Sequence, residues 1–78
     1  MRYPIRPKSE MEYIARVSAD LMVHEDMTLW QISGTIDIPM STVYASLMEV
    51  LPCLDIPAFR KVRLRLEAHK RRGGKRHG

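Results

Sequence analysis

The segment TLWQISGTIDIPMSTVYASLMEVL, residues 28–51, predicts two short helices separated by a tight turn. Thr28 and Gln31 have the spacing of a capping box, in which the hydroxyl accepts a bond from a free backbone N–H and the glutamine reaches back to the cap. Leu29, Ile32 and Ile36 then recur at intervals of three and four residues, as on one face of a helix. The first helix is therefore expected to begin just after Thr28.

Asp37 and Pro39 mark the turn, because aspartate tolerates left-handed backbone and the fixed φ of proline suits the first turn of a helix. The helix that follows has an apolar stripe formed by Val43, Leu47, Val50 and Leu51. Its opposite face carries small or hydroxylated residues, Ser41, Thr42, Ala45 and Ser46. This is the pattern of a helix-turn-helix, whose second helix is free to read a groove of nucleic acid.

Two further helices are expected on either side of this segment. Ser9 and Glu12 resemble a capping box for a helix that ends near His24, and Asp55 is a suitable N-cap for a helix that begins at Ile56. Pro52 is expected to end the preceding helix, and Gly73-Gly74 to stop the last one. The chain is thus expected to be all-α, a small helix-turn-helix domain of three helices plus a basic C-terminal helix. Its predicted parts are a flexible basic arm (1–8), a DNA-binding domain (9–72) and a flexible basic tail (73–78).

The charge of the chain is distributed very unevenly. The 78 residues carry a net charge of +4, but residues 60–78 hold nine Lys or Arg and one acid, whereas residues 1–59 hold four bases and eight acids. Such a basic end indicates an anionic partner, nucleic acid first and an acidic membrane second, and the alternative is a solvated tail that only keeps the protein soluble. The single cysteine, Cys53, permits no internal disulfide and suits a reducing cytosol, and no apolar run is long enough to span a membrane.

Several residues have alternative interpretations. His24, Glu25 and Asp26 could suggest a metal site, but neighbours in a short loop rarely converge on one ion, so no metal or other cofactor is expected. Trp30 is expected to cover the edge of the core or to pack on the first helix. Gly34 indicates either close packing against another helix or an early helix end. His69 is expected to be packed at the edge of the last helix.

In their order and spacing, several short pieces of this sequence resemble the stage III sporulation protein D family of bacterial transcription regulators. The pieces are Ser41-Thr42-Val43, Leu51-Pro52, the cap Asp55, His69-Lys70 and Arg72-Gly73-Gly74. The correspondence covers about Met11 to Lys70. The resemblance implies a cytoplasmic, nucleoid-associated, sequence-specific DNA-binding protein without enzymatic activity, which binds double-stranded DNA as a monomer, with a dimer as the alternative.

By position, the resemblance implies two sets of contact residues. The base-reading set on the third helix is Met40, Ser41, Thr42, Tyr44, Ala45 and Ser46. The backbone-neutralising set is Arg60, Lys61, Arg63, Arg65, Lys70, Arg71 and Arg72, to which the tail adds Lys75 and Arg76. The base-reading set contains no Lys or Arg, so the strong arginine–guanine contact is unavailable to it.

This last feature keeps a second hypothesis open, a helical protein-interaction module with an electrostatic tail. Its binding patch would contain Met40, Tyr44 and Ala45. An enzyme is not expected, because the sequence has no nucleophile–base pairing, no metal-ligand cluster and no phosphate-binding glycine loop. No small-molecule substrate and no membrane partner are expected either.

Overall fold

The computed structural model describes residues 7–77, with side chains placed for residues 7–70. This part of the chain contains only helices, so the all-α prediction is confirmed. In chain order they are α1 (Lys8–His24), α2 (Leu29–Ile36), α3 (Met40–Ala45), the π-helical turn η1 (Ser46–Val50), α4 (Leu51–Leu54) and α5 (Ile56–His77). None of these helices combines the length and hydrophobicity needed to cross a membrane.

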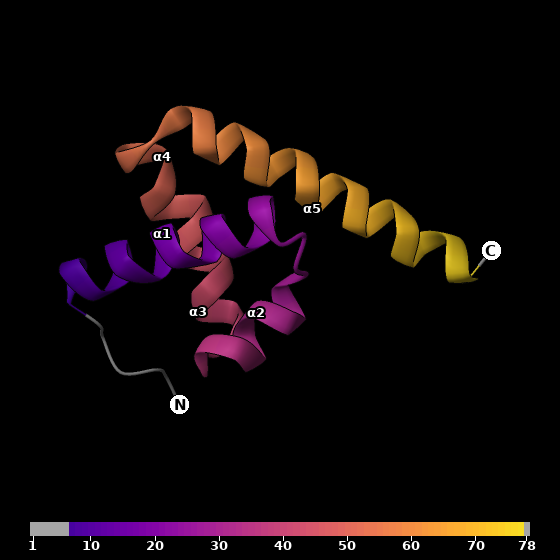
Figure 1. Ribbon diagram of the computed structural model, residues 1–78, viewed down its shortest axis with the longest axis horizontal. Helices are drawn as coiled ribbons and strands as arrows, with labels where there is room; N and C mark the ends of the chain where they lie inside the picture. The colour runs from indigo at the N-terminus through magenta and orange to yellow at the C-terminus, as the bar shows by residue number, and fades with distance from the viewer. Residues whose placement is uncertain (1–6, 78) are drawn as a thin grey trace.

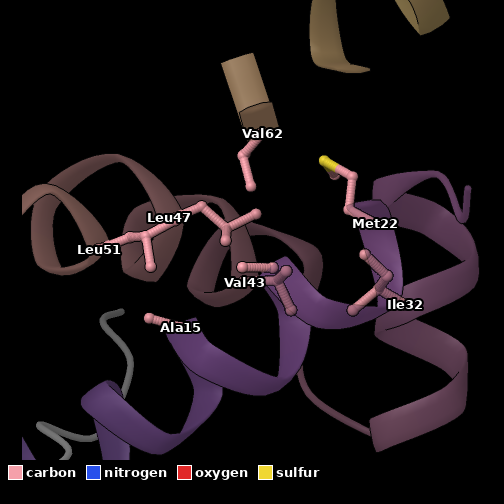
Figure 2. Packing of buried hydrophobic residues seen from close by; sticks show 8 residues of the cluster. Ala15, Met22, Ile32, Val43, Leu47, Leu51 and Val62 are labelled. Carbon is pink, nitrogen blue, oxygen red and sulfur yellow. The ribbon is translucent and has the colours of Figure 1, made fainter. Parts of the chain in front are cut away.

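Helix α1 is the centre of the domain, because it packs against every other helical element. The long helix α5 follows one edge, and its C-terminal part projects beyond the other helices (Figure 1). Every helical element supplies core side chains. The buried apolar residues are Ile14, Ala15, Ala19 and Met22 of α1, Ile32 of α2, Val43 of α3, Leu47 of η1, Leu51 of α4 and Val62 of α5. Figure 2 shows the packing of Ala15, Met22, Ile32, Val43, Leu47, Leu51 and Val62. The apolar stripes predicted in residues 28–51 supply four of these residues, Ile32, Val43, Leu47 and Leu51, whereas the other three stripe residues, Leu29, Ile36 and Val50, are half-buried.

The start of α1 differs from the prediction. No side chain caps this helix; instead Pro7 is the N-cap residue, and its carbonyl accepts a bond from the Met11 N–H at 3.0 Å. Ser9 and Glu12 are therefore inside the helix and do not form a capping box. The fixed φ of Pro7 and its extended ψ of 151° prepare the chain for the helical turn that follows. Of the predicted arm, residues 1–6 lie outside the described residues.

The third helix continues past Pro52, contrary to the prediction. In a regular α-helix the ring of Pro52 would clash with the carbonyl of Met48, four residues earlier. Here the π turn η1 precedes the proline, and the Leu51 N–H donates to the Ser46 carbonyl, five residues back. This wider turn gives the ring room, so that α4 extends to Leu54 before the backbone becomes extended at Asp55.

The buried face continues through this π turn. Val43, Leu47 and Leu51 are all buried, as are Ile14, Ser18 and Met22 at the same spacing of four residues in the regular helix α1. A step of four residues rotates a side chain by only about 40° past one full turn, so such residues share one apolar face.

Helix α5 begins as predicted and ends later than predicted. The Asp55 carboxylate accepts a bond from the Ala58 N–H at 3.1 Å, which confirms the predicted cap. The helix then continues through Gly73 and Gly74 to His77, so the end predicted at the two glycines was wrong. A glycine costs a helix only about 1 kcal/mol relative to alanine, which disfavours helical backbone without forbidding it.

Candidate nucleic-acid interface

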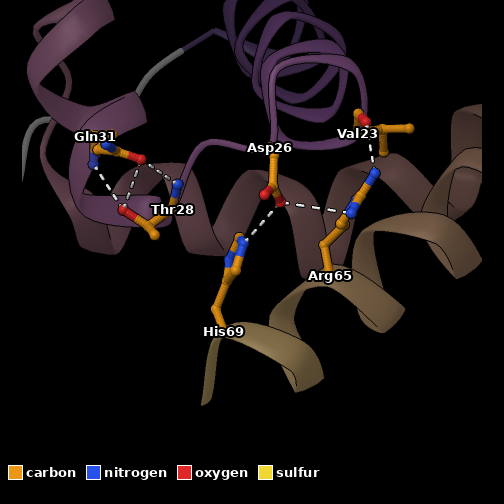
Figure 3. Close-up of polar contacts among 6 residues, drawn as sticks. All are labelled: Val23, Asp26, Thr28, Gln31, Arg65 and His69. Carbon is orange, nitrogen blue, oxygen red and sulfur yellow. Dashed lines mark hydrogen bonds and ion pairs between the residues drawn. The ribbon is translucent and has the colours of Figure 1, made fainter. Parts of the chain in front are cut away.

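Helix α2 is fixed by local bonds at both of its ends. The predicted capping box is present at the start of α2: the Gln31 N–H donates to Thr28 Oγ1 at 3.2 Å, and the Thr28 N–H donates to Gln31 Oε1 at 2.9 Å (Figure 3). After α2, Asp37 has φ 59° and ψ 46°, which confirms the predicted left-handed turn. The Ser33 hydroxyl donates to the Ile38 carbonyl at 2.6 Å and closes the turn.

This turn fixes which face of α3 points outward. The Pro39 carbonyl accepts bonds from the N–H groups of Thr42 and Val43, and Val43 is completely buried. On the other side of the helix Met40 and Tyr44 are 41% and 48% exposed, and Ser41 is exposed as well. Thr42 and Ala45 are half-buried at the edges of this face. Five of the six predicted base-reading residues are therefore accessible.

Ser46 is the exception in the predicted base-reading set. Its side chain is 0% exposed, and its hydroxyl donates to the Val43 carbonyl at 2.7 Å. A small polar residue on a helix can bond a carbonyl of the preceding turn, and it is then satisfied without solvent. Ser46 therefore belongs to the core and cannot contact a base.

The side chain of Arg65 likewise has its polar partners within the fold. Its Nη2 donates to the Val23 carbonyl at 3.1 Å, and its Nη1 lies 3.5 Å from Asp26 Oδ1 (Figure 3). The same carboxylate oxygen is 3.2 Å from Nε2 of His69, whose side chain is only 11% exposed. His69 is thus packed at the edge of α5 as expected, and Arg65 joins α5 to the end of α1 instead of extending freely toward a phosphate.

The remaining basic residues of α5 lie on different sides of the helix. Arg63 and Lys70 border a groove that also contains Trp30 and Tyr44, whereas Lys61 borders the cleft between α1 and α5. Arg60 lies beside the exposed Leu64 on the outer surface. Only Arg63 and Lys70 therefore share a groove with the exposed face of α3. Side chains of the other predicted phosphate contacts, Arg71, Arg72, Lys75 and Arg76, lie outside those described.

The groove itself was not predicted from the sequence. We call it the α2–α5 groove; it has a volume of about 690 Å³ and lies between the start of α2, the α3–η1 segment and the middle of α5. Trp30 is 75% exposed at its border, so the prediction that this residue covers the core or packs on α1 was wrong. The position of Trp30 off the apolar stripe of its helix was the one feature of the sequence that could have indicated its exposure. No feature of the sequence indicates the groove, because the groove depends on where α5 packs.

Among residues 7–70, no group of three His, Cys, Asp or Glu side chains is arranged to hold a metal ion. No protein-family model, curated protein or solved structure matches this chain.

Proposed function

We propose that this protein is a sequence-specific DNA-binding regulator of transcription, of the kind found in the stage III sporulation protein D family. In this proposal the α2–turn–α3 segment is a helix-turn-helix, α3 enters the major groove, and the basic helix α5 contacts the phosphate backbone. The proposed setting is the bacterial cytoplasm, at the nucleoid and in sporulation. The protein would bind duplex DNA as a monomer, with a dimer as the alternative, and would have no enzymatic activity.

The proposal rests on the packing of α3, because only one face of this helix contacts the core. Val43 and Leu47 are buried, whereas Met40, Ser41 and Tyr44 are exposed on the other side of a helix whose start is fixed by a three-residue turn. A helix that reads DNA needs this division, because one face must be rigidly held while the other remains free for base edges. A serine hydroxyl can bond a base or phosphate, and Met40 can pack on a thymine methyl.

The proposal assigns affinity and specificity to different residues. Arg60, Lys61, Arg63 and Lys70 are exposed, and with Arg71, Arg72, Lys75 and Arg76 they would neutralise phosphates. Ser46 and Arg65 are not included, because both are bonded within the fold. Specificity would come from the accessible residues of α3, at roughly 1–3 kcal/mol for each base pair that is distinguished.

The test is selection of DNA from a duplex library with a randomised centre at near-physiological salt, followed by sequencing of the retained molecules. We expect a motif of several base pairs. The Ser41→Ala variant should bind this motif about fivefold more weakly, a loss of about 1 kcal/mol, as for one hydrogen bond. Ser9→Ala, a matched change of an exposed serine on α1, should not alter binding. Retention without any motif would contradict sequence-specific reading.

A second candidate function is a helical protein-interaction module with an electrostatic tail. It is favoured by the absence of Lys and Arg from α3 and by the exposure of Tyr44, a residue type enriched at protein interfaces. Failure to retain any duplex in the experiment above would favour this candidate.

A further inference from the structure

The walls of the α2–α5 groove are held in place by the polar contacts shown in Figure 3. Thr28, at the start of α2, and His69, on α5, both border the groove. The capping box holds Thr28, and the bond of His69 to Asp26 joins α5 to the connection before α2. Asp26 also contacts Arg65, one helical turn before His69. The groove therefore exists in the fold before any partner binds, which lowers the entropy cost of binding.

The groove combines exposed aromatic rings with an apolar floor. Trp30 and Tyr44 are 75% and 48% exposed, and the half-buried side chains of Leu29, Met48 and Leu66 also line the groove. Tryptophan, tyrosine and methionine are enriched in protein interfaces, where large side chains are removed from water. The lining thus requires an occupant that has apolar side chains of its own.

The α5 wall of the groove has an alternating charge pattern. Arg63, Glu67 and Lys70 all line it, and their spacing of four and three residues places them in one row along the helix. All three side chains are exposed. A single phosphate can contact Arg63 or Lys70, but a nucleic-acid strand lying along the whole row would also meet Glu67, which would repel it. A peptide can offer two acidic residues to Arg63 and Lys70 and a basic residue to Glu67.

We propose that the α2–α5 groove binds an amphipathic helix of a partner protein. The apolar side of this helix would contact Trp30, Tyr44 and Leu66, and one flank would carry an acidic, a basic and a second acidic residue at matching intervals. This site does not include the proposed base contacts Met40 and Ser41, but it shares Tyr44, Arg63 and Lys70 with the proposed DNA-binding surface, so a peptide and DNA would compete for these three side chains. The proposal stands whether or not α3 binds DNA.

The test uses the full chain and a display library of helical peptides of about 16 residues, roughly four turns, with randomised side chains. We expect enrichment of amphipathic peptides with two acidic residues about seven positions apart, which places them on one face. Their Kd should rise at least tenfold with Trp30→Ala and with Lys70→Glu, because these changes remove an aromatic contact and invert one charge of the row. Both residues are exposed, so the thermal unfolding midpoint should not change.

Two matched variants control for general effects. Tyr13→Ala removes another exposed aromatic residue, on α1, and Lys61→Glu inverts another lysine of α5 that borders the cleft with α1. Neither should change the Kd of the selected peptides. The proposal is overturned if no peptide is enriched or if the enriched peptides are basic. It is also overturned if the control variants raise the Kd of the selected peptides as much as Trp30→Ala and Lys70→Glu do.

Discussion

Asp26 is the residue at which the end of α1, the start of α2 and the middle of α5 meet. Its φ of 55° is left-handed, a conformation normally taken by glycine after a helix. The Met27 N–H reaches back to the Leu21 carbonyl at 3.3 Å, which completes the helix end. A glycine would fit this backbone with less strain, but it would lack the carboxylate that contacts Arg65 and His69.

This double role predicts different effects for two substitutions. Asp26→Ala should lower the free energy of unfolding by about 1–2 kcal/mol, because alanine is strained in left-handed backbone and has no carboxylate to bind α5. Asp26→Asn should have less than half this effect, since asparagine tolerates this backbone and keeps an acceptor for His69. Urea unfolding measures the free energy of unfolding of both variants, and their m-values should equal that of the unmodified protein. Equal stability of the two variants would contradict the assigned role.

Asp26 and Asp37 also show what local sequence can reveal. The left-handed conformation of Asp37 was predicted, because it lies between two apolar helical stripes that leave room only for a sharp turn. The role of Asp26 was missed, because its partner His69 is 43 residues further along the chain. Ser46 and Arg65 were wrongly assigned to the DNA-binding surface for a similar reason. The periodicity of a helix shows on which face a residue lies, but it does not show whether the side chain is already hydrogen-bonded within the fold.

At the scale of elements, Gly34 weakens α2 without a steric reason. The sequence suggested close packing or an early helix end at this glycine, and neither is present. Helix α2 continues to Ile36, and a Cβ added at Gly34 would have no heavy atom within 4 Å. The apolar stripes of residues 28–51 correctly predicted that Ile32, Val43, Leu47 and Leu51 are buried. The π turn was missed, because the tendency of proline to end helices is a rule about regular α-helices.

Gly34→Ala should therefore raise the free energy of unfolding by about 0.5–1 kcal/mol, since alanine has the higher helix propensity and restricts the unfolded chain. The thermal midpoint should rise by several degrees for a domain of this size. The matched control is Ala68→Gly on the exposed surface of α5, which should lower stability by a similar amount. A destabilised Gly34→Ala variant would mean that α2 has a neighbour at this position.

At the scale of the whole molecule, the sequence predicted the charge asymmetry but not its arrangement in space. Which basic residues share a side depends on how α5 is rotated, and Val62 determines this by inserting into the core. Arg63 then borders the α2–α5 groove and Lys61 the opposite cleft. A rotation set by distant contacts cannot be derived from the periodicity of one helix.

The proposed division between affinity and specificity can be tested with a chain that ends at Lys70. This truncation removes Arg71, Arg72, Lys75 and Arg76. Binding to all duplexes should weaken, and the slope of log K against log salt concentration should become flatter by about 0.9 for each phosphate that is no longer neutralised. The preferred motif should stay the same, because the accessible residues of α3 are retained.

Charge and helix length must be separated in this experiment, since the truncation also shortens α5. A full-length variant with glutamine at the same four positions keeps the length and removes the charge, and it should reproduce the flatter slope. Stability should be unchanged in both, because the buried side chains all lie before Lys70 among those described. An unaltered slope in the glutamine variant would assign the phosphate contacts to the first half of α5, where Arg60, Lys61 and Arg63 are exposed.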